Sequence, residues 1–322
     1  MTTSVNMIRV SATEALTAVR AALEAAGLSR EDARCVADSL VDAELTGRTG
    51  HGLVRLPDLL KHAAARGSDR ILVTRDSGSL VSLDGQGALG HLVGARATSI
   101  ALERLAEHPM VAVGCRGSKH TGAIGYHVRQ LALAGHAALA MTHCMPLLAP
   151  HGARRAVFGT NPIAFACPGP DYPFVVDVSP AKTTFGAVLA ALERGESLEP
   201  GSALDADGEP ATDPARAKGG ALMPMGGPKG SALAFMVQLV AGALCGAAGV
   251  PEPGKDYGFF LLSLRMNAFV DEGRVAQAIT EIADAVHGAD AKCAGEGSEA
   301  RRKSLIENGF DVPRNLWVGI RG

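Results

Sequence analysis

The sequence predicts an α/β protein, in which a β-sheet carries helices on its faces and follows an entirely helical first segment. Residues 1–67 show helical signals alone, whereas from Ile71 onward short β-rich runs alternate with helical ones. Of the 322 residues, 47% are hydrophobic and 20% are charged, which excludes disorder and leaves enough apolar surface for a sizeable core. We therefore expect one large α/β unit or two closely joined domains.

Capping residues place the first helices. Ser11 with Glu14 forms a capping box, and Ser29 with Asp32 opens the next helix in the same way. The three expected helices run from Ser11 to about Ala26, from Ser29 to Leu45 and from Pro57 to about Ala65.

The β-rich runs after this segment are short and are separated by helical patterns. The expected strands are ILVT at 71, SLVSL at 79, VAVGC at 111, AALAMTHC at 137, PIAFACP at 162, FVVDVS at 174 and GFFLLSLRMNAF at 258. The expected helices cover residues 90–107, 123–134, a stretch ending near Leu192, and 273–286, and a charged tail begins at Ala291.

Two stretches need separate interpretation. Residues 193–218 are polar and rich in Gly, Pro and Asp, which is typical of a long surface excursion. Residues 233–250 are nearly apolar, but Gln238 and several small residues favour a buried helix of a soluble core over a membrane span.

Charge and cysteine content narrow the class of ligand and the compartment. The formal net charge is −2, which argues against nucleic acid as a partner and favours a small ligand. The six cysteines form no CxxC pair, and the first residues lack a signal-peptide pattern. We expect free thiols in a cytoplasmic protein.

The segment from Gly47 to Pro57 joins two helices and places His51 and Arg55 at the break between them. Loops held by rigid flanks are where catalytic residues concentrate. Taken alone, the segment favours a surface connection between helices that happens to carry a His and an Arg.

Gly85, Gly87 and Gly90 form a GxGxxG pattern between an expected strand and an expected helix. A dinucleotide-binding Rossmann unit has an acid at the end of its second strand, where this chain has Arg116. Arg116 can accept a 2′-phosphate, so a Rossmann unit stays open at this point, although a glycine-rich turn is favoured.

Two glycine-rich loops can bind an anion or a carboxamide. Residues 117–125 join a strand end to a helix start and include Lys119 and His120, and residues 226–230 lead into the most apolar helix. The second loop lacks Walker spacing, and pyrophosphate is the ligand we expect there.

Thr160 and Ser179 lie at strand ends, where α/β proteins bind ligands, but each can equally serve to cap a turn.

The sequence contains no HxxxH, HExxH or acid–His cluster at ligand spacing, so no metal is expected. It contains no GxSxG elbow of a serine hydrolase either.

Seven segments together resemble, in order and spacing, the type-2 malate/L-lactate dehydrogenase family, which also contains ureidoglycolate and sulfolactate dehydrogenases and the Δ1-piperideine-2-carboxylate/Δ1-pyrroline-2-carboxylate reductases. They are GHGLVRLP at 50, GSKHTGAIGY at 117, FGTNPIAFACP at 158, VVDVS at 175, ALDADGEPATDP at 203, LMPMGGPKGSALAFMVQLVAGAL at 222 and AGEGSEARRK at 294.

The resemblance implies a large mixed sheet with flanking helices, a non-Rossmann NAD(P)-binding fold and a homodimer. It also implies hydride transfer between the nicotinamide and C2 of a small 2-oxo, 2-hydroxy or cyclic imino acid. The resemblance also implies that the glycine pattern at 85–90 is not a dinucleotide-binding turn. The expected parts are an N-terminal helical segment (1–68), an α/β core (69–271) and a C-terminal helix and tail that pack on the core (272–322).

Carried over by position, His51 resembles the general acid/base, Arg55 the clamp on the substrate carboxylate and Thr160 a second substrate contact. His120 is the alternative acid. The expected cofactor contacts are His120, Thr121, Gly122, Ala123, Ile124, Asp177, Val178, Ser179, Pro228, Lys229, Gly230 and Glu296. Both NADP and NAD remain open, and Arg116 with Lys119 favours NADP.

The chain departs from the family pattern at two positions. Gly50 stands where the family has Ser before the His, and Ala187 stands where the imino acid reductases often have Asp. Both losses remove groups that orient protons at His51. A 2-oxo/2-hydroxy acid is therefore favoured over a cyclic imine, and a non-catalytic cofactor-binding relative is a further alternative.

Overall fold

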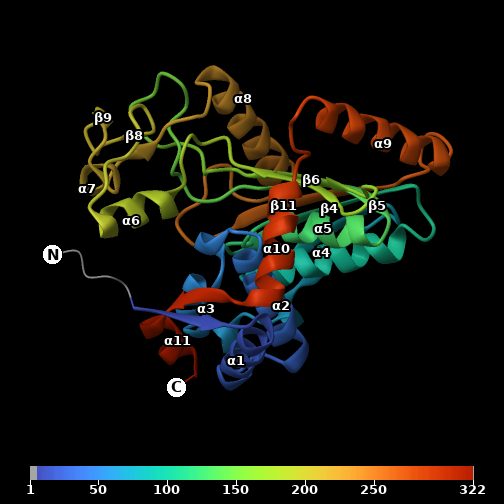
Figure 1. Ribbon diagram of the computed structural model, residues 1–322, viewed down its shortest axis with the longest axis horizontal. Helices are drawn as coiled ribbons and strands as arrows, with labels where there is room; N and C mark the ends of the chain where they lie inside the picture. The colour runs from blue at the N-terminus through green and yellow to red at the C-terminus, as the bar shows by residue number, and fades with distance from the viewer. Residues whose placement is uncertain (1–5, 322) are drawn as a thin grey trace.

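A seven-stranded mixed sheet forms the centre of the computed structural model, which describes residues 6–321 (Figure 1). The strand order is β2-β3-β4-β11-β5-β6-β7, and β3 and β4 run parallel whereas the other neighbours pair antiparallel. The strands are β2 Leu72–Asp76, β3 Leu80–Asp84, β4 Met110–Ser118, β5 His136–Thr142, β6 Ile163–Cys167, β7 Phe174–Val178 and β11 Tyr257–Arg265. The predicted α/β class with a large mixed sheet is confirmed.

The glycines at 85–90 allow the turn between β3 and α4 (Gly90–Arg104) to pack closely against the loop that follows β4. They join β3 to α4, the crossover helix of the parallel pair. A Cβ on Gly90 would lie 2.3 Å from the carbonyl oxygen of Lys119 and 2.4 Å from that of His120. The space that a pyrophosphate takes in a Rossmann turn is thus filled by the loop that follows β4.

Helices cover both faces of the sheet. Helices α4 and α5 (Gly125–Leu133) lie on one face, and α8 (Pro228–Val237) with its π-helical continuation η5 (Gln238–Leu244) lies on the other (Figure 1). The alternation along β5 follows from this arrangement, since Ala138 packs in the core beneath α5 whereas Met141 packs against the α8 side.

The prediction that residues 233–250 form a buried helix is wrong for one side of it. Phe235, Met236, Leu239 and Leu244 are exposed in the chain as described, and Leu244 is 81% exposed. One side of the stretch is buried and the other is exposed, although the residues on both sides are apolar. The hydrophobic pattern of the sequence therefore cannot distinguish the two sides. Across residues 6–321, no helix is both long and apolar enough to cross a membrane.

The N-terminal helices form a layer below the sheet together with the C-terminus (Figure 1). The capping box of Ser11 and Glu14 is present, and Ser29 accepts a hydrogen bond from the Asp32 N–H. Helix α3 ends earlier than expected and is followed by separate 3-10 turns. The elements of this layer are β1 Met7–Val10, α1 Ala12–Ala25, α2 Arg30–Leu45, η1 Thr49–His51, η2 Leu53–Arg55, α3 Leu56–Leu60, η3 Ala63–Ala65, η4 Ser68–Arg70, β12 Phe310–Pro313 and α11 Arg314–Arg321.

Residues 193–218 are folded, contrary to the predicted surface excursion. A small sheet of order β10-β8-β9 stands beside α6 and α7, with Ala203 and Ala211 buried. Asp205 accepts the N–H groups of Asp207 and Glu209, so the polar residues satisfy a tight turn. The elements are α6 Phe185–Arg194, β8 Ala203–Leu204, β9 Pro210–Ala211, α7 Pro214–Ala217 and β10 Ala221–Leu222.

The tail beyond β11 contains more structure than predicted. Helix α9 (Glu272–Gly288) lies at the edge of the molecule, and α10 (Glu296–Asn308) crosses in front of the sheet to reach α2 (Figure 1). An ion pair between Arg302 and Asp42, with 3.2 Å between Nε and Oδ1, joins α10 to α2. Strand β12 then pairs antiparallel with β1.

Candidate active site

His51 and Arg55 lie on the two 3-10 turns η1 and η2, between α2 and α3. The predicted break between helices is present, with Gly47 in the left-handed region at φ +79°. The Nε–H of Arg55 donates to the carbonyl of Gly50 over 2.7 Å, which closes the loop around His51. This hydrogen bond and the two 3-10 turns fix the positions of His51 and Arg55 within the loop.

Glu44 supports this loop from below, a role that the sequence did not single out. Its Oε1 accepts the Leu53 N–H over 2.7 Å, and a Cβ on Gly52 would lie 2.1 Å from the same oxygen. Burial raises the pKa of Glu44 to about 7, and the bond from Leu53 opposes that rise. The sequence feature that could have identified Glu44 is its position on the buried face of α2, one helical turn after Leu40.

The structure brings the two candidate imidazoles together. The rings of His51 and His120 are stacked, with 5.2 Å between their centroids and 9° between their planes. His120 arrives from the loop after β4, so the stack joins segments that are 69 positions apart in the sequence. Nδ1 of His120 accepts the Gly122 N–H over 3.2 Å, which places the proton of the neutral ring on Nε2.

Both rings are neutral at neutral pH. Burial lowers the pKa of His51 to about 4, with a further contribution from the Arg55 guanidinium. Burial, and then His51, holds the pKa of His120 well below its ordinary value. Among the described residues, Nδ1 of His51 is buried without a hydrogen-bond partner, which leaves Nε2 as the nitrogen that can reach a ligand.

Two further imidazoles, His91 and His127, continue behind His120. His91 lies 6.4 Å from His120 between ring centroids, and neither of its ring nitrogens has a partner in the described part of the chain. A Cβ on Gly122 would lie 2.6 Å from His91 Nε2, so the left-handed Gly122 is required for the close approach. Burial lowers the pKa of His91 to about 3 and that of His127 to about 4. No sequence pattern pointed to either residue.

Asp177 connects β7 to the His51 loop and to α5. Its Oδ2 lies 2.8 Å from Nε of Arg48 and accepts the Gly125 N–H over 3.2 Å. These residues line a narrow pocket that α10 borders on the other side. Its lining also includes Thr46, Ala123, Val175, Gly295, Ser298 and Glu299.

A family model described as malate/L-lactate dehydrogenase matches residues 10–321. An L-sulfolactate dehydrogenase of Methanothermobacter thermautotrophicus is 30% identical over 98% of this chain and 96% of its own. The chain belongs to the malate/L-lactate dehydrogenase family. It is therefore an oxidoreductase that uses a nicotinamide cofactor.

Two other similar proteins act on different substrates according to their names. A (2R)-3-sulfolactate dehydrogenase (NADP(+)) of Chromohalobacter salexigens is 40% identical over 74% of this chain and 72% of its own. The crystal structure of a Δ1-piperideine-2-carboxylate reductase from Pseudomonas syringae superposes with a TM-score of 0.88 at 28% identity, covering 98% of this chain and 99% of that one.

The family positions after β4, residues 121–124, are all buried, with Thr121 and Ile124 almost fully so. Of these four residues only Ala123 lines the pocket. The Thr121 hydroxyl lies 3.4 Å from that of Thr142.

Two predicted cofactor segments lie side by side. The Met225 N–H donates to the carbonyl of Pro180 over 2.8 Å, which joins the end of β7 to the loop before α8. Gly230 is buried against that carbonyl, since a Cβ there would lie 2.6 Å from it. Val178, Pro228 and Lys229 are exposed at this junction.

Thr160 lies close to the same junction. The Ser179 hydroxyl donates to the Thr160 carbonyl over 2.8 Å and accepts the Ala181 N–H. The Thr160 hydroxyl is 3.8 Å from the sulfur of Cys144. The Ser179 hydroxyl thus stabilises the turn, and its contact with a cofactor stays a prediction.

The two cations that favoured NADP are already engaged. The guanidinium of Arg116 lies 2.9 Å from Oδ2 of Asp84, and the ammonium of Lys119 donates to the carbonyl of Gly254. Arg301 instead lines a second, more open pocket beside the start of α10, together with Gly297 and Ser298. This second pocket adjoins the first, since Thr46, Gly295 and Ser298 line both.

The family departures lie in open surroundings. A Cβ on Gly50 would meet no atom within 4 Å, so the family's Ser fits at this position. Ala187 is exposed in the first turn of α6, and its N–H donates to the Thr184 hydroxyl. Neither residue is required by packing.

Proposed function

We propose that the chain transfers a hydride between a nicotinamide cofactor and C2 of a small 2-oxo/2-hydroxy acid, with His51 as acid/base and Arg55 as carboxylate clamp. The observation that carries this assignment is the stacked pair of His51 and His120 beside the guanidinium of Arg55. One imidazole can exchange a proton with the substrate oxygen while Arg55 fixes the carboxylate.

The neutral state of His51 suits the oxidative direction without further change. A neutral imidazole accepts the hydroxyl proton as the hydride leaves C2 for the oxidised cofactor. In the reductive direction the protonated ring donates to the oxygen as C2 receives the hydride. A bound carboxylate offsets the Arg55 charge that lowers the pKa of His51, so substrate binding raises that pKa toward neutrality.

The two adjoining pockets support a dinucleotide site in this proposal. Ala123, Gly125 and Asp177 line the first, the start of α10 borders both, and the glycines there allow close approach of a ligand. When bound, the cofactor supplies the hydride or accepts it. The contacts proposed from the sequence stay proposals, and Glu296 has the least support because its carboxylate faces the α9–α10 turn.

We propose NADP as the preferred cofactor. Arg301 beside the N-terminus of α10 is a cation positioned for a phosphate group, and one relative is named as NADP(+)-dependent. Arg116 and Lys119 contribute less to this preference because each already has a partner.

We also propose a cytoplasmic homodimer. All six cysteines are free thiols, which suits a reducing compartment. The exposed apolar side chains of α8 and η5 form a surface that a second copy can cover.

The variants His51→Ala, His120→Ala and Arg55→Lys test the roles. We expect His51→Ala to lower kcat by about 10²- to 10⁴-fold. Arg55→Lys removes the bidentate hydrogen bonds between the guanidinium and the substrate carboxylate, so it should mainly raise KM for the acid. His120→Ala should weaken NADPH binding, measured by nucleotide fluorescence.

The exposed His62→Ala serves as the matched control and should leave kcat and KM unchanged. Retention of kcat in His51→Ala, together with its loss in His120→Ala at normal cofactor affinity, would assign the acid/base role to His120 instead.

The cyclic imino acid is the second candidate, because the piperideine-2-carboxylate reductase shares the fold over nearly the whole chain. The exposed Ala187 lacks the carboxylate that such reductases often have there, which favours the 2-oxo acid. Turnover of Δ1-pyrroline-2-carboxylate with NADPH, compared with 2-oxo acids in one panel, separates the two.

A further inference from the structure

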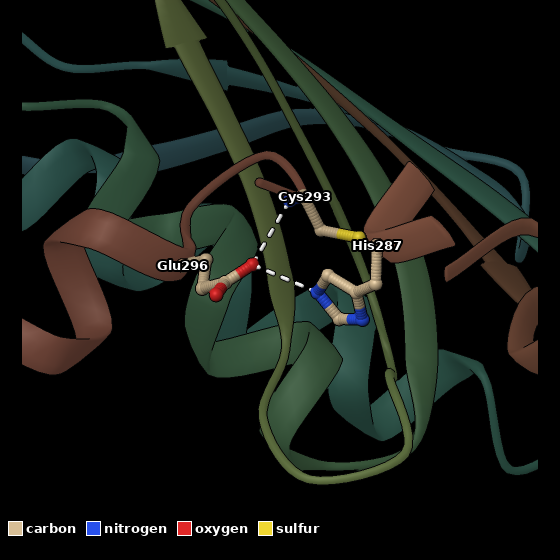
Figure 2. Close-up of side chains that lie close together, drawn as sticks. All are labelled: His287, Cys293 and Glu296. Atoms are coloured by element: carbon tan, nitrogen blue, oxygen red, sulfur yellow. Dashed lines mark hydrogen bonds and ion pairs between the residues drawn. The ribbon is translucent and has the colours of Figure 1, made fainter. Parts of the chain in front are cut away.

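His287, Cys293 and Glu296 form a cluster of side chains of metal-ligating types, separate from the stacked rings of His51 and His120. The imidazole nitrogen, the sulfur and a carboxylate oxygen all lie within 4.8 Å of one another. Figure 2 shows the three side chains converging from the end of α9, the connecting loop and the start of α10. The sequence predicted no metal because the spacing of His287, Cys293 and Glu296 matches none of the common zinc-binding motifs.

We propose that this cluster is a Zn²⁺ site that fixes the connection between α9 and α10. Thiolate, imidazole and carboxylate together are a donor set for zinc rather than for magnesium or calcium. In tetrahedral zinc coordination, neighbouring ligand atoms are roughly 3.3–3.6 Å apart. Movements of about 1 Å would bring the cluster to that geometry.

Two contacts already orient the carboxylate for this role. Oε2 of Glu296 lies 3.0 Å from His287 Nε2 and accepts the Cys293 N–H over 3.0 Å (Figure 2). Tyr172 lies beside the same carboxylate, as an outer residue that steadies a ligand would. Zinc binds a cysteine as its thiolate, so uptake of the metal at Cys293 releases the proton of this thiol.

The site is accessible, and three protein ligands leave a fourth position for water. The His287 side chain is 48% exposed and that of Glu296 is 28% exposed, so the metal can enter from solvent. His287 lies in the last turn of α9, and Cys293 and Glu296 flank Gly295.

Helix α9 has little other anchorage at this end. Within this fully described helix only Ala283 is buried, and Ile282 is 62% exposed. The loop that carries Cys293 is better fixed, since the carbonyl of Ala294 accepts the Val175 N–H and a Cβ on Gly295 would lie 2.8 Å from Val175 N. A zinc ion would therefore tie the loose end of α9 to β7 and to the wall of the cofactor pocket.

Zinc titration of the full-length protein tests the site, after dialysis against a chelator and with the thiols kept reduced. We expect one Zn²⁺ per chain by calorimetry and a rise of several degrees in Tm. His287→Ala, Cys293→Ser and Glu296→Gln should each weaken binding at least tenfold. Co²⁺ should give a thiolate-to-metal charge-transfer band that Cys293→Ser abolishes.

His62→Ala and Cys167→Ser are the matched controls, because each removes a surface or half-buried donor elsewhere, and both should bind zinc as the wild type does. Failure to take up one equivalent of Zn²⁺ would overturn the proposal. So would unchanged zinc affinity in Cys293→Ser or His287→Ala, since the ion would then be held at another place.

Discussion

At the scale of single residues, the His51 loop depends on partners that lie far apart in sequence or deep in the fold. His51, Arg55 and His120 could be proposed as site residues from the sequence because they lie in glycine-containing motifs that resemble those of a known family. Glu44 and His91 were not, because their importance rests on what lies against them: the Leu53 N–H in one case and the His120 ring in the other. A residue's chemistry can be read from the chain, but its burial and its partner cannot.

Glu44 gives a pH-dependent contribution to stability with a definite sign. Its pKa is about 7 when folded, above the ordinary value of 4.5, so the folded state holds the proton more tightly than the unfolded state does. The free energy of unfolding therefore falls as pH rises from about 4.5 to 7 and is level above that range.

Glu44→Gln retains an acceptor for Leu53 and removes the titration. Relative to wild type, it should gain up to about 3 kcal/mol of stability between pH 5 and pH 8, measured by urea unfolding at both values. The exposed Glu24→Gln should show no such gain. An equal Glu44→Gln effect at both pH values would show that the carboxyl does not titrate in this range.

Gly50→Ser tests whether the missing hydroxyl limits proton transfer. The added side chain meets no atom within 4 Å, so folding should be unaffected. A hydroxyl next to His51 can orient the ring, and we expect kcat to rise several-fold with little change in KM. A kcat equal to or below that of the wild type would mean that another group already orients His51.

At the scale of elements, local signals predicted the main strands and helices, and tertiary contacts decided the rest. Strand β1 pairs with β12 across almost the whole chain, which no local pattern can reveal. The two-residue strands β8 and β9 are too short to show periodicity, so the sequence around Asp205 does not reveal that this segment is folded. The outward face of α8 was hidden because its inner and outer residues are equally apolar.

That outward face leads to a prediction about assembly. Leu239 is 45% exposed on η5, and a charge there would be buried in a dimer that uses this surface. Leu239→Glu should therefore be monomeric by size-exclusion chromatography with light scattering, whereas the wild type is dimeric.

Val318→Glu is the matched control, since Val318 is exposed on α11, in the N-terminal layer, and should leave the dimer intact. A monomeric wild type, or a dimeric Leu239→Glu variant, would exclude α8 and η5 as the interface.

At the scale of the whole molecule, the sheet order explains how the site is assembled. Strand β11 enters between β4 and β5, so segments from distant parts of the chain meet around one pocket. The alternation of strands and helices predicted the α/β class, and the family resemblance implied a large mixed sheet. The strand order itself was not predicted, because the patterns of single strands do not specify their neighbours. The pocket then depends on α10, which reaches it from near the C-terminus.

The substrate panel tests the central proposal most directly. Malate, lactate, sulfolactate, ureidoglycolate and Δ1-pyrroline-2-carboxylate would each be assayed with NAD and NADP, in oxidised or reduced form as the reaction requires, through the absorbance of NAD(P)H. We expect turnover of at least one 2-hydroxy acid, faster with NADP than with NAD, and its loss in His51→Ala. Binding of NADPH without turnover of any of these compounds would contradict the proposed activity and support a non-catalytic cofactor-binding protein.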